Sequence, residues 1–252
     1  MDLPRSSAVD QEDPVRALRA LRMASVTDAP VDPEAEQTLL RLGPALVRSE
    51  PELVRDELMT LLCGPGAGRI LRSCPEVFAA MIPDLAPMIG YDQRNHHHSY
   101  DLWEHTVQGV ENIPPEPALR LTMLLHDTGK PAVRTLDAKG EAHYAGHQAA
   151  SAEIAARVTE ALCLDRETAD RVVRLVRYHD IRLRTDSGAV NLDRPFLLDR
   201  LHRFGEKDLR ALFEIHRADR TATGYSSPER EQRRMEERMA ALDALLADLT
   251  KI

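Results

Sequence analysis

Apolar side chains recur along most of the chain at the i, i+3, i+4 and i+7 spacing of helix faces, and the alternation typical of strands is scarce. The spacing predicts a helix from about Asp13 to Ser25 and a second helix after Asp32. A third helix is predicted after Ser49-Glu50-Pro51-Glu52, which fits a capping box, and it ends at Gly64-Pro65-Gly66. We therefore predict an all-α protein.

The second half of the chain continues this pattern with longer helices. The stretch from Leu136 to Gly146 interrupts it and is predicted to be a loop with a small hairpin around Lys139-Gly140. The last helix begins at Ser227-Pro228, and its charged run EREQRRMEER is predicted to be a solvated face. Four leucines are predicted to dock the end of this helix: Leu242, Leu245, Leu246 and Leu249.

The predicted elements group into four segments. Residues 1–10 are polar and predicted to be disordered, and residues 11–90 form a smaller helical region. Residues 91–225 form the main helical bundle, and residues 226–252 form a C-terminal helix packed on it. The chain has 252 residues, of which 43% are hydrophobic but only 4% aromatic, so it can bury a large core of mostly aliphatic side chains.

The net charge argues against a protein that binds nucleic acid over its whole surface. The formal charge is −8, so no general basic field would attract RNA, and tRNA remains a possible partner only through a local contact. One series of arginines fits either such a contact or a solvated helix face, and we favour the second interpretation. The series comprises Arg166, Arg171, Arg174, Arg177, Arg182 and Arg184.

Cysteine usage and hydropathy indicate the compartment. The 3 cysteines are widely spaced and never form a CxxC pair, so neither a disulfide framework nor a thiolate zinc site is indicated. The N-terminus lacks an apolar signal core, and no run of about 18 apolar residues occurs. We therefore predict a cytoplasmic protein with reduced thiols and without membrane association.

Candidate chemistry comes from polar side chains that share helix faces with apolar ones. His126 shares a face with Leu119 and Met123, and His179 shares one with Val172 and Val176. A single buried histidine is usually a hydrogen-bonded core residue, but burying several polar groups together is costly unless they are paired or ligate a metal. The full set of inward-facing candidates is His105, His126, Asp127, His147, His179 and Asp219.

The ligand types narrow the choice of metal. Imidazole nitrogen and carboxylate oxygen, without sulfur, favour Mn, Fe, Ni, Co or Zn. The candidate set exceeds the need of one tetrahedral zinc, so it could hold one ion or two ions bridged by Asp127. With two ions, a metal-activated hydroxide between them would attack phosphorus while the ions hold the phosphoryl oxygens. The prediction is a divalent transition-metal site that serves hydrolysis.

A resemblance to a known family supports this interpretation. The heptad LLHDTGK at residues 124–130, with a preceding His105 and a following Asp219, resembles the H…HD…D signature of the HD superfamily of metal-dependent phosphohydrolases. The resemblance implies an HD-domain helical bundle over residues 91–225. It also implies two ligand sets: His105, His126, Asp127 and Asp219 for one ion, with His147 and His179 for a second.

A closer resemblance covers most of the chain, from about residue 11 to residue 225. The stretches YDLWEHT, LLHDTGKP, GEAHYAGHQAASAEIA and HRADRTATG are similar to the HD region of bacterial class II CCA-adding tRNA nucleotidyltransferases. EDPVRALRALR resembles their neck motif, which implies base recognition by Asp13 and Arg16, although we favour their interpretation as a helix cap and an i, i+3 ion pair. We expect no nucleotide addition by this chain alone, because the catalytic head of that family has no counterpart before Glu12.

The resemblance implies hydrolysis of nucleotide phosphate esters, by a 2′,3′-cyclic phosphodiesterase, a phosphatase or both. Asp127 and Lys130 are the expected catalytic residues, the lysine by neutralising charge on the substrate phosphate. An alternative interpretation of Lys130 is a charge that favours a helix C-terminus. The candidate substrate contacts are Lys130, His97, His98 and His143, with a surface-loop position as the favoured alternative for His143.

Three hypotheses follow from the sequence. The first is a stand-alone HD phosphohydrolase, monomeric or homodimeric, that acts on a small nucleotide or phosphodiester. The second is a non-polymerising body subunit or remnant of a split tRNA nucleotidyltransferase, which binds tRNA or a separate head protein. The third is a helical interaction module without metal. The complete set of candidate ligands favours the first hypothesis.

Overall fold

The computed structural model describes residues 14–46, 49–94, 99–181, 183 and 190–251. This part of the chain is helical almost throughout, which confirms the predicted all-α class, and its strands form one two-stranded sheet. Several predictions concern residues outside the described ranges: residues 1–10, Asp13, His97, His98, Arg182 and Arg184.

Proline begins many of the helices, because its fixed φ suits the first helical turn and its missing N–H is not needed there. Helices that begin in this way are α1 (Pro14–Val26), α2 (Pro33–Leu46), α3 (Pro51–Cys63), α5 (Pro75–Met81), the 3-10 helix η1 (Pro83–Met88), α7 (Pro117–Leu125) and α12 (Pro228–Leu249). The predicted capping box is wrong. Glu50, not Ser49, is the N-cap of α3, and its side chain makes no capping hydrogen bond.

The first group of helices packs around α1, which contacts α2, α3 and α4 (Ala67–Ser73). Their apolar faces supply fully buried side chains such as Leu18 and Leu58. On the outer side of the α1–α3 contact, Glu57 pairs with Arg19 and Arg22, each at 2.8 Å. The predicted apolar helix faces therefore pack into one mainly aliphatic core, and charged side chains lie at its margin.

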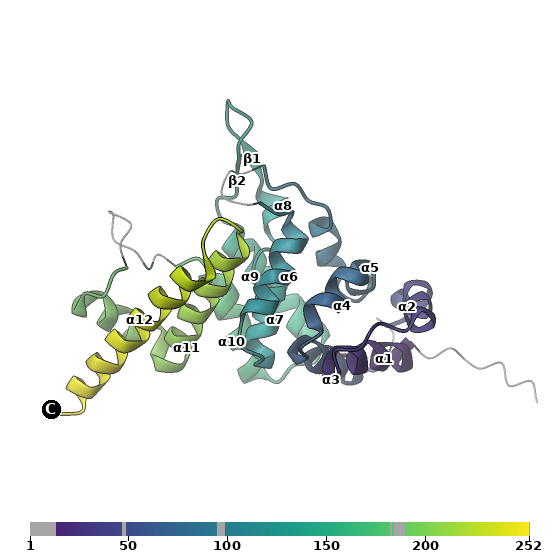
Figure 1. Ribbon diagram of the computed structural model, residues 1–252, viewed down its shortest axis with the longest axis horizontal. Helices are drawn as coiled ribbons and strands as arrows, with labels where there is room; N and C mark the ends of the chain where they lie inside the picture. The colour runs from purple at the N-terminus through teal and green to yellow at the C-terminus, as the bar shows by residue number, and fades with distance from the viewer. Residues whose placement is uncertain (1–13, 47–48, 95–98, 182, 184–189, 252) are drawn as a thin grey trace, which may run out of the picture.

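Helix α6 (Leu102–Asn112) lies near the middle of the molecule and connects the first group of helices to the rest (Figure 1). It packs against α4, α7 and α11 (Arg194–Ala222). Asp101 caps its start by accepting a hydrogen bond from the N–H of Glu104 at 2.7 Å. Trp103 Nε1 donates to the carbonyl of Leu71 in α4 at 3.2 Å, so the two parts share a hydrogen bond as well as a core.

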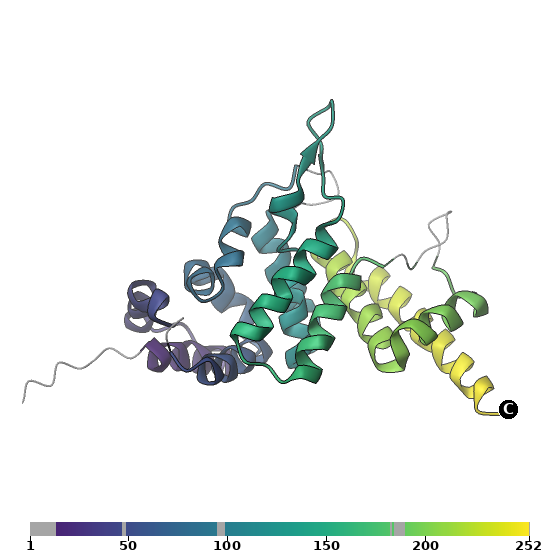
Figure 2. The same cartoon turned by 180° about the vertical axis from the view of Figure 1, so that it is seen from behind.

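Helices α9 (His147–Ala161) and α10 (Arg166–Tyr178) lie side by side on the face shown in Figure 2. The chain reaches α9 through the short helix α8 (Lys130–Val133) and a projecting hairpin of β1 (Thr135–Leu136) and β2 (Ala142–His143). The predicted hairpin is therefore confirmed. Asp137 Oδ1 accepts from the N–H groups of Lys139 and Glu141, which holds the turn.

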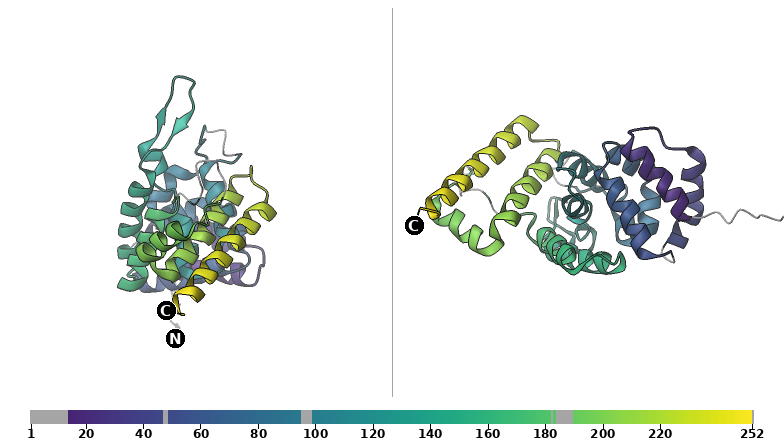
Figure 3. Two further views of the ribbon diagram at one scale, coloured as in Figure 1. Left: turned by 90° about the vertical axis from the view of Figure 1, so that its left-hand side faces the viewer. Right: turned by 90° about the horizontal axis from the view of Figure 1, so that it is seen from below.

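Helix α11 bends at Gly205, whose φ of 72° lies in the left-handed region that favours glycine. The second half of α11 packs against α6, and α12 runs along α11 at one end of the molecule (Figure 3). Leu242 and Leu245 of α12 are buried as predicted. The docking prediction is wrong for Leu249, which is 38% exposed.

Two groups of charged residues predicted to be solvated include buried members. Glu231 and Arg238 of the α12 run are buried. In α10, Arg171 is buried and its Nε lies 3.0 Å from Asp208 Oδ1 of α11, while Arg174 pairs with the same carboxylate. The prediction of a wholly solvated face is therefore wrong in both segments. The α10 pairs instead tie α11 to α10.

A search of the described helices finds none with both the length and the hydrophobicity needed to cross a bilayer.

Candidate metal centre

The predicted ligands converge at helix ends rather than along helix middles. His126 and His179 occupy the C-cap positions of α7 and α10, and His147 is the first residue of α9. His105 lies in the first turn of α6, and Asp219 lies in the last turn of α11. Their potential ligand atoms form two groups, each within 4.8 Å: His105, His126, Asp127 and Asp219 in one, and Asp127, His147 and His179 in the other.

Every histidine of the centre turns its Nδ1 toward a backbone carbonyl. The carbonyl oxygens are those of Ala222 for His105 (3.2 Å), Met123 for His126 (2.7 Å), Tyr144 for His147 (2.8 Å) and Val176 for His179 (2.7 Å). Because a carbonyl only accepts, Nδ1 carries the proton and donates it. In the neutral ring, Nε2 then keeps its lone pair and faces the centre.

The first group brings two imidazoles against two carboxylates. The Nε2 atoms of His105 and His126 lie 3.2 Å apart. Asp127 Oδ2 is 3.3 Å from the first and 3.2 Å from the second. Asp219 Oδ1 lies 3.1 Å from His105 Nε2 and 3.7 Å from His126 Nε2. These four atoms surround a space of the size that one cation would fill.

The second group uses the other oxygen of the same carboxylate. Asp127 Oδ1 lies 3.4 Å from His147 Nε2 and 3.6 Å from His179 Nε2. These two Nε2 atoms are 3.3 Å apart. Asp127 therefore faces one pair of histidines with each of its oxygens, as a carboxylate shared by two ions would.

The donor set fits divalent transition metals. Within the described residues, neither buried oxygen of Asp127 accepts a hydrogen bond of normal geometry, although Lys130 Nζ forms an ion pair at 2.6 Å from Oδ2. Imidazole lone pairs and carboxylate oxygens in contact repel one another unless a positive charge lies among them. Metal-binding histidines are held by the same kind of Nδ1–carbonyl contact that this centre shows.

The electrostatics of the centre also favour cations. Burial lowers the pKa of His126, but Asp127 and Asp219 outweigh this effect and raise it to about 10. Both carboxylates likewise raise the pKa of His105 against the effect of burial. In turn, the surrounding positive groups hold the pKa values of Asp127 and Asp219 well below their usual range despite burial. The carboxylates stay ionised and attract protons or metal ions.

Lys130 lies inside the centre, at 6% exposure. Its Nζ contacts Asp127 Oδ2 and donates to Gln93 Oε1 at 3.0 Å. Gln93 is 2% exposed and escaped the sequence analysis, because it lies in an irregular segment without helical periodicity. The contact of Lys130 with a substrate phosphate stays a prediction.

The remaining substrate-contact candidates are not gathered at the ligands. His143 lies on β2 with its side chain 55% exposed, and its Nε2 is 3.5 Å from Asp137 Oδ2 of the same hairpin. It belongs to neither ligand group, so its contact with a substrate stays a prediction. His97 and His98 lie outside the described residues.

Gly129 explains how Asp127 reaches the histidine of α9. Its N–H donates to Ser151 Oγ at 2.9 Å. A Cβ at position 129 would lie 2.6 Å from Ser151 N and 2.7 Å from the carbonyl oxygen of His147, which is closer than real Cβ contacts. Only glycine permits this approach, so the glycine of LLHDTGK brings the α7–α8 turn against the start of α9.

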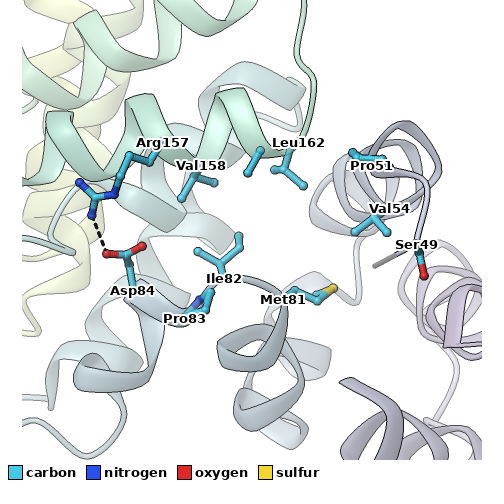
Figure 4. A pocket seen from close by; sticks show the side chains of 11 residues that line it. Ser49, Pro51, Val54, Met81, Ile82, Pro83, Asp84, Arg157, Val158 and Leu162 are labelled. Carbon is cyan, nitrogen blue, oxygen red and sulfur yellow. Dashed lines mark hydrogen bonds and ion pairs between the residues drawn. The ribbon is translucent and has the colours of Figure 1, made fainter. Parts of the chain in front are cut away.

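An apolar cavity of about 200 Å³ lies away from this centre (Figure 4). Val54, Ile82 and Val158 point into it, and the ion pair of Asp84 with Arg157 lies at its edge at 2.8 Å. Arg157 follows His147 along the same helix by about 15 Å at 1.5 Å per residue. The cavity is therefore separate from the ligand groups.

The fold and the centre define a helical protein with a histidine–aspartate metal site. The family model described as HD domain matches residues 96–224, about half of the chain. The chain therefore belongs to the HD domain family, and the match contains every predicted metal ligand.

Several relatives extend this likeness. The chain is 29% identical to an A-adding tRNA nucleotidyltransferase of Deinococcus radiodurans, over 69% of this chain and 43% of that protein. It is 31% identical to a multifunctional CCA protein of Azoarcus sp., over 86% of this chain and 54% of that protein. It is 28% identical to a bifunctional uridylyltransferase/uridylyl-removing enzyme of Caulobacter vibrioides, over 67% of this chain and 20% of that enzyme. The predicted resemblance is thus confirmed, and the chain spans about half or less of the length of these relatives.

Proposed function

We propose that this protein is a metal-dependent phosphohydrolase that cleaves phosphate esters of nucleotides, with 2′,3′-cyclic phosphodiesters as the leading substrate class. The observation that supports it most is the position of Asp127. Each oxygen of this buried carboxylate faces the Nε2 atoms of two histidines, which is an arrangement suited to two divalent cations. Membership of the HD domain family agrees with this chemistry.

The candidate ligands would hold two ions. His105, His126 and Asp219 would hold one ion, His147 and His179 the other, and Asp127 would serve both. Bound divalent ions would supply positive charge to phosphoryl oxygens and acidify water at the site.

Two further groups keep this arrangement in place. The backbone carbonyls accept from Nδ1 of each histidine, so that in the neutral ring Nε2 offers its lone pair to a metal ion. Lys130, held by Gln93, adds a fixed positive charge next to Asp127 where a phosphate oxygen would approach.

The names of the relatives support a nucleotide substrate. One relative is named for removing uridylyl groups, and removal of such a group breaks a bond to phosphorus. The others are named for tRNA nucleotidyl transfer or as multifunctional CCA proteins. A hydrolytic centre with similar surroundings would therefore act on a nucleotide or on the end of an RNA.

The test is hydrolysis by chelator-stripped protein to which Mn²⁺, Co²⁺ or Ni²⁺ is returned. We expect metal-dependent cleavage of adenosine 2′,3′-cyclic phosphate and of bis(p-nitrophenyl) phosphate. Asp127→Asn should reduce kcat by at least 100-fold, as loss of a principal electrostatic group does. Asp56→Asn, at a side chain that is 67% exposed, is the matched control and should retain activity. Failure of every metal to elicit hydrolysis of either substrate would contradict the proposal.

A second candidate is a body subunit of a tRNA nucleotidyltransferase. It is favoured by the Azoarcus relative, whose similarity covers 86% of this chain and so extends beyond the HD domain match. We expect such a subunit to bind tRNA in a mobility-shift assay or to copurify with a separately encoded head. Binding of neither would count against it and leave the hydrolase proposal in place.

A further inference from the structure

A second cavity, of about 400 Å³, opens where the start of α9, the end of α10 and the first half of α11 meet. Its lining is rich in arginine, although the protein as a whole has a charge of −8. We call it the arginine cavity. The side chains that matter here are Gln148, Arg177, Tyr178, Asp180, Arg200 and Arg203.

The arginine cavity adjoins the second ligand group. Gln148 and Asp180 line it, and each directly follows a metal-ligand candidate, His147 and His179 respectively. Neighbouring Cα atoms are about 3.8 Å apart, so the cavity wall and the ligand group share the same stretch of backbone. Gln148 Nε2 also donates to Asp180 Oδ2 at 3.3 Å, which joins the two walls. The arginine cavity and the second ligand group are therefore neighbours, although no ligand candidate lines the cavity itself.

Aromatic rings hold two of the guanidinium groups. The guanidinium of Arg203 lies 4.7 Å from the ring centre of Tyr178 and 5.3 Å from that of Phe204. That of Arg200 lies 4.8 Å from the ring centre of Phe196. Stacked guanidiniums lose less freedom on binding an anion than arginines that move freely in water.

The side chains that line the arginine cavity carry a net positive charge. Arg200 pairs with Asp199 at 2.6 Å, and Asp180 adds one carboxylate to the lining. Within the described residues, Arg177 and Arg203 form no ion pair, so their donors remain available. Planar guanidinium forks match the oxygens of phosphates and carboxylates, and in a phosphohydrolase the anion available to such a pair is a phosphate of the substrate.

We propose that the arginine cavity binds a phosphate of the substrate other than the one being hydrolysed. The preferred substrates are then nucleotides or oligonucleotides that carry a second phosphate, rather than a nucleoside with a single cyclic phosphate. This inference rests on the proposed function for the identity of the reacting group, but its phosphate recognition can be measured without turnover.

The experiment compares two ligands by calorimetric titration of the full chain, both Mn²⁺-loaded and chelator-stripped. Adenosine 3′,5′-bisphosphate carries a second phosphate, and adenosine 3′-monophosphate does not. We expect the loaded wild type to bind the bisphosphate at least 10-fold more tightly. Each charge-assisted contact contributes about a factor of ten, so Arg177→Gln with Arg203→Gln should reduce bisphosphate affinity roughly 100-fold. Affinity for the monophosphate should change by less than about 3-fold.

The control changes the same net charge on exposed arginines away from the arginine cavity. Arg166→Gln with Arg233→Gln removes one exposed arginine from α10 and one from α12, and affinity for both ligands should stay within about 3-fold of wild type. A third ligand, the dinucleotide ApAp, distinguishes the two sources of phosphate. A gain with ApAp that depends on Arg177 and Arg203 would identify an internal phosphodiester, and a gain with the bisphosphate alone would identify a terminal phosphate.

Two outcomes would overturn the inference: equal affinity of the wild type for bisphosphate and monophosphate, or a bisphosphate preference that the Arg177 and Arg203 variant keeps. If no metal elicits hydrolysis but the arginine-dependent preference is present, the proposed reaction fails and the phosphate-binding assignment stands. If hydrolysis occurs and the preference is absent, the reaction stands and this inference fails.

Discussion

Replacing Asp127 with asparagine tests whether one carboxylate serves two metal positions. Asparagine has nearly the same shape, so the variant removes the charge and one strong ligand while it keeps the packing of a side chain that is 2% exposed. Because Asp127 belongs to both ligand groups, the change weakens both at once. A metal that binds only the folded protein stabilises it in proportion to its affinity, so thermal stability reports the loss.

The expected magnitudes follow from linkage. Free metal at about 100 times Kd stabilises the wild type by about 2.7 kcal/mol. For a chain of this size, 1 kcal/mol corresponds to about 2–4 °C in Tm, so adding metal should raise Tm by about 5–10 °C. In Asp127→Asn the increment should fall below about 2 °C. Without metal the variant should also unfold earlier, because the charge of Lys130 loses its partner in a buried position.

The assay is thermal unfolding of chelator-stripped protein, with and without Mn²⁺, for the wild type, Asp127→Asn and the exposed control Asp56→Asn. Elemental analysis after desalting gives the bound metal independently of stability. We expect Asp127→Asn to lose both the bound metal and the metal-dependent rise in Tm. The control Asp56→Asn should keep both. The reasoning is refuted if wild type and Asp127→Asn show the same increment and the same metal content.

Two further predictions concern packing and pH. Gly129→Ala should destabilise the protein by about 1–3 kcal/mol in urea unfolding and weaken Mn²⁺ binding, because its Cβ would push α9 away from Asp127. Hydrogen bonds from Arg19 and Arg22 outweigh burial and lower the pKa of Glu57 below its usual value of 4.5. Glu57→Gln should therefore cost about 1 kcal/mol at neutral pH. The difference from wild type should vanish as pH falls below 4.5 and through the lowered pKa, and a wild-type advantage that persists in acid would contradict this assignment.

Helix positions could be predicted because periodicity and proline are local signals. The starts of α1, α2 and α12 follow from Pro14, Pro33 and Pro228 in this way. The capping box failed because Pro51 takes the first helical position of α3 and makes Glu50 the N-cap. Ion pairs between distant segments could not be predicted in this way. The burial of Arg171 in α10, for example, depends on Asp208, which lies far along the chain in α11.

The identity of the candidate ligands was also accessible from sequence, because histidine and aspartate on apolar faces are costly without a shared partner. The sharing of both Asp127 oxygens between two pairs of histidines was predicted only as a possibility, since it depends on distances between four helices. Gln93 and Ser151 carried no signal of their own. Each takes its role from a partner, Lys130 or Gly129, that the three-dimensional fold brings close.

The helix ends that form this centre also determine its protonation. The carbonyls of Met123 and Val176 belong to the last turns of α7 and α10, where many backbone acceptors lack an i+4 partner, and Val176 also accepts from the backbone N–H of His179 at 3.5 Å. The following histidines satisfy these carbonyls through Nδ1, and the same bond leaves Nε2 free to face Asp127. The hydrogen bonds that complete the ends of α7 and α10 therefore also orient the Nε2 atoms of His126 and His179 toward the centre. For this reason the folded backbone itself orients these two nitrogens.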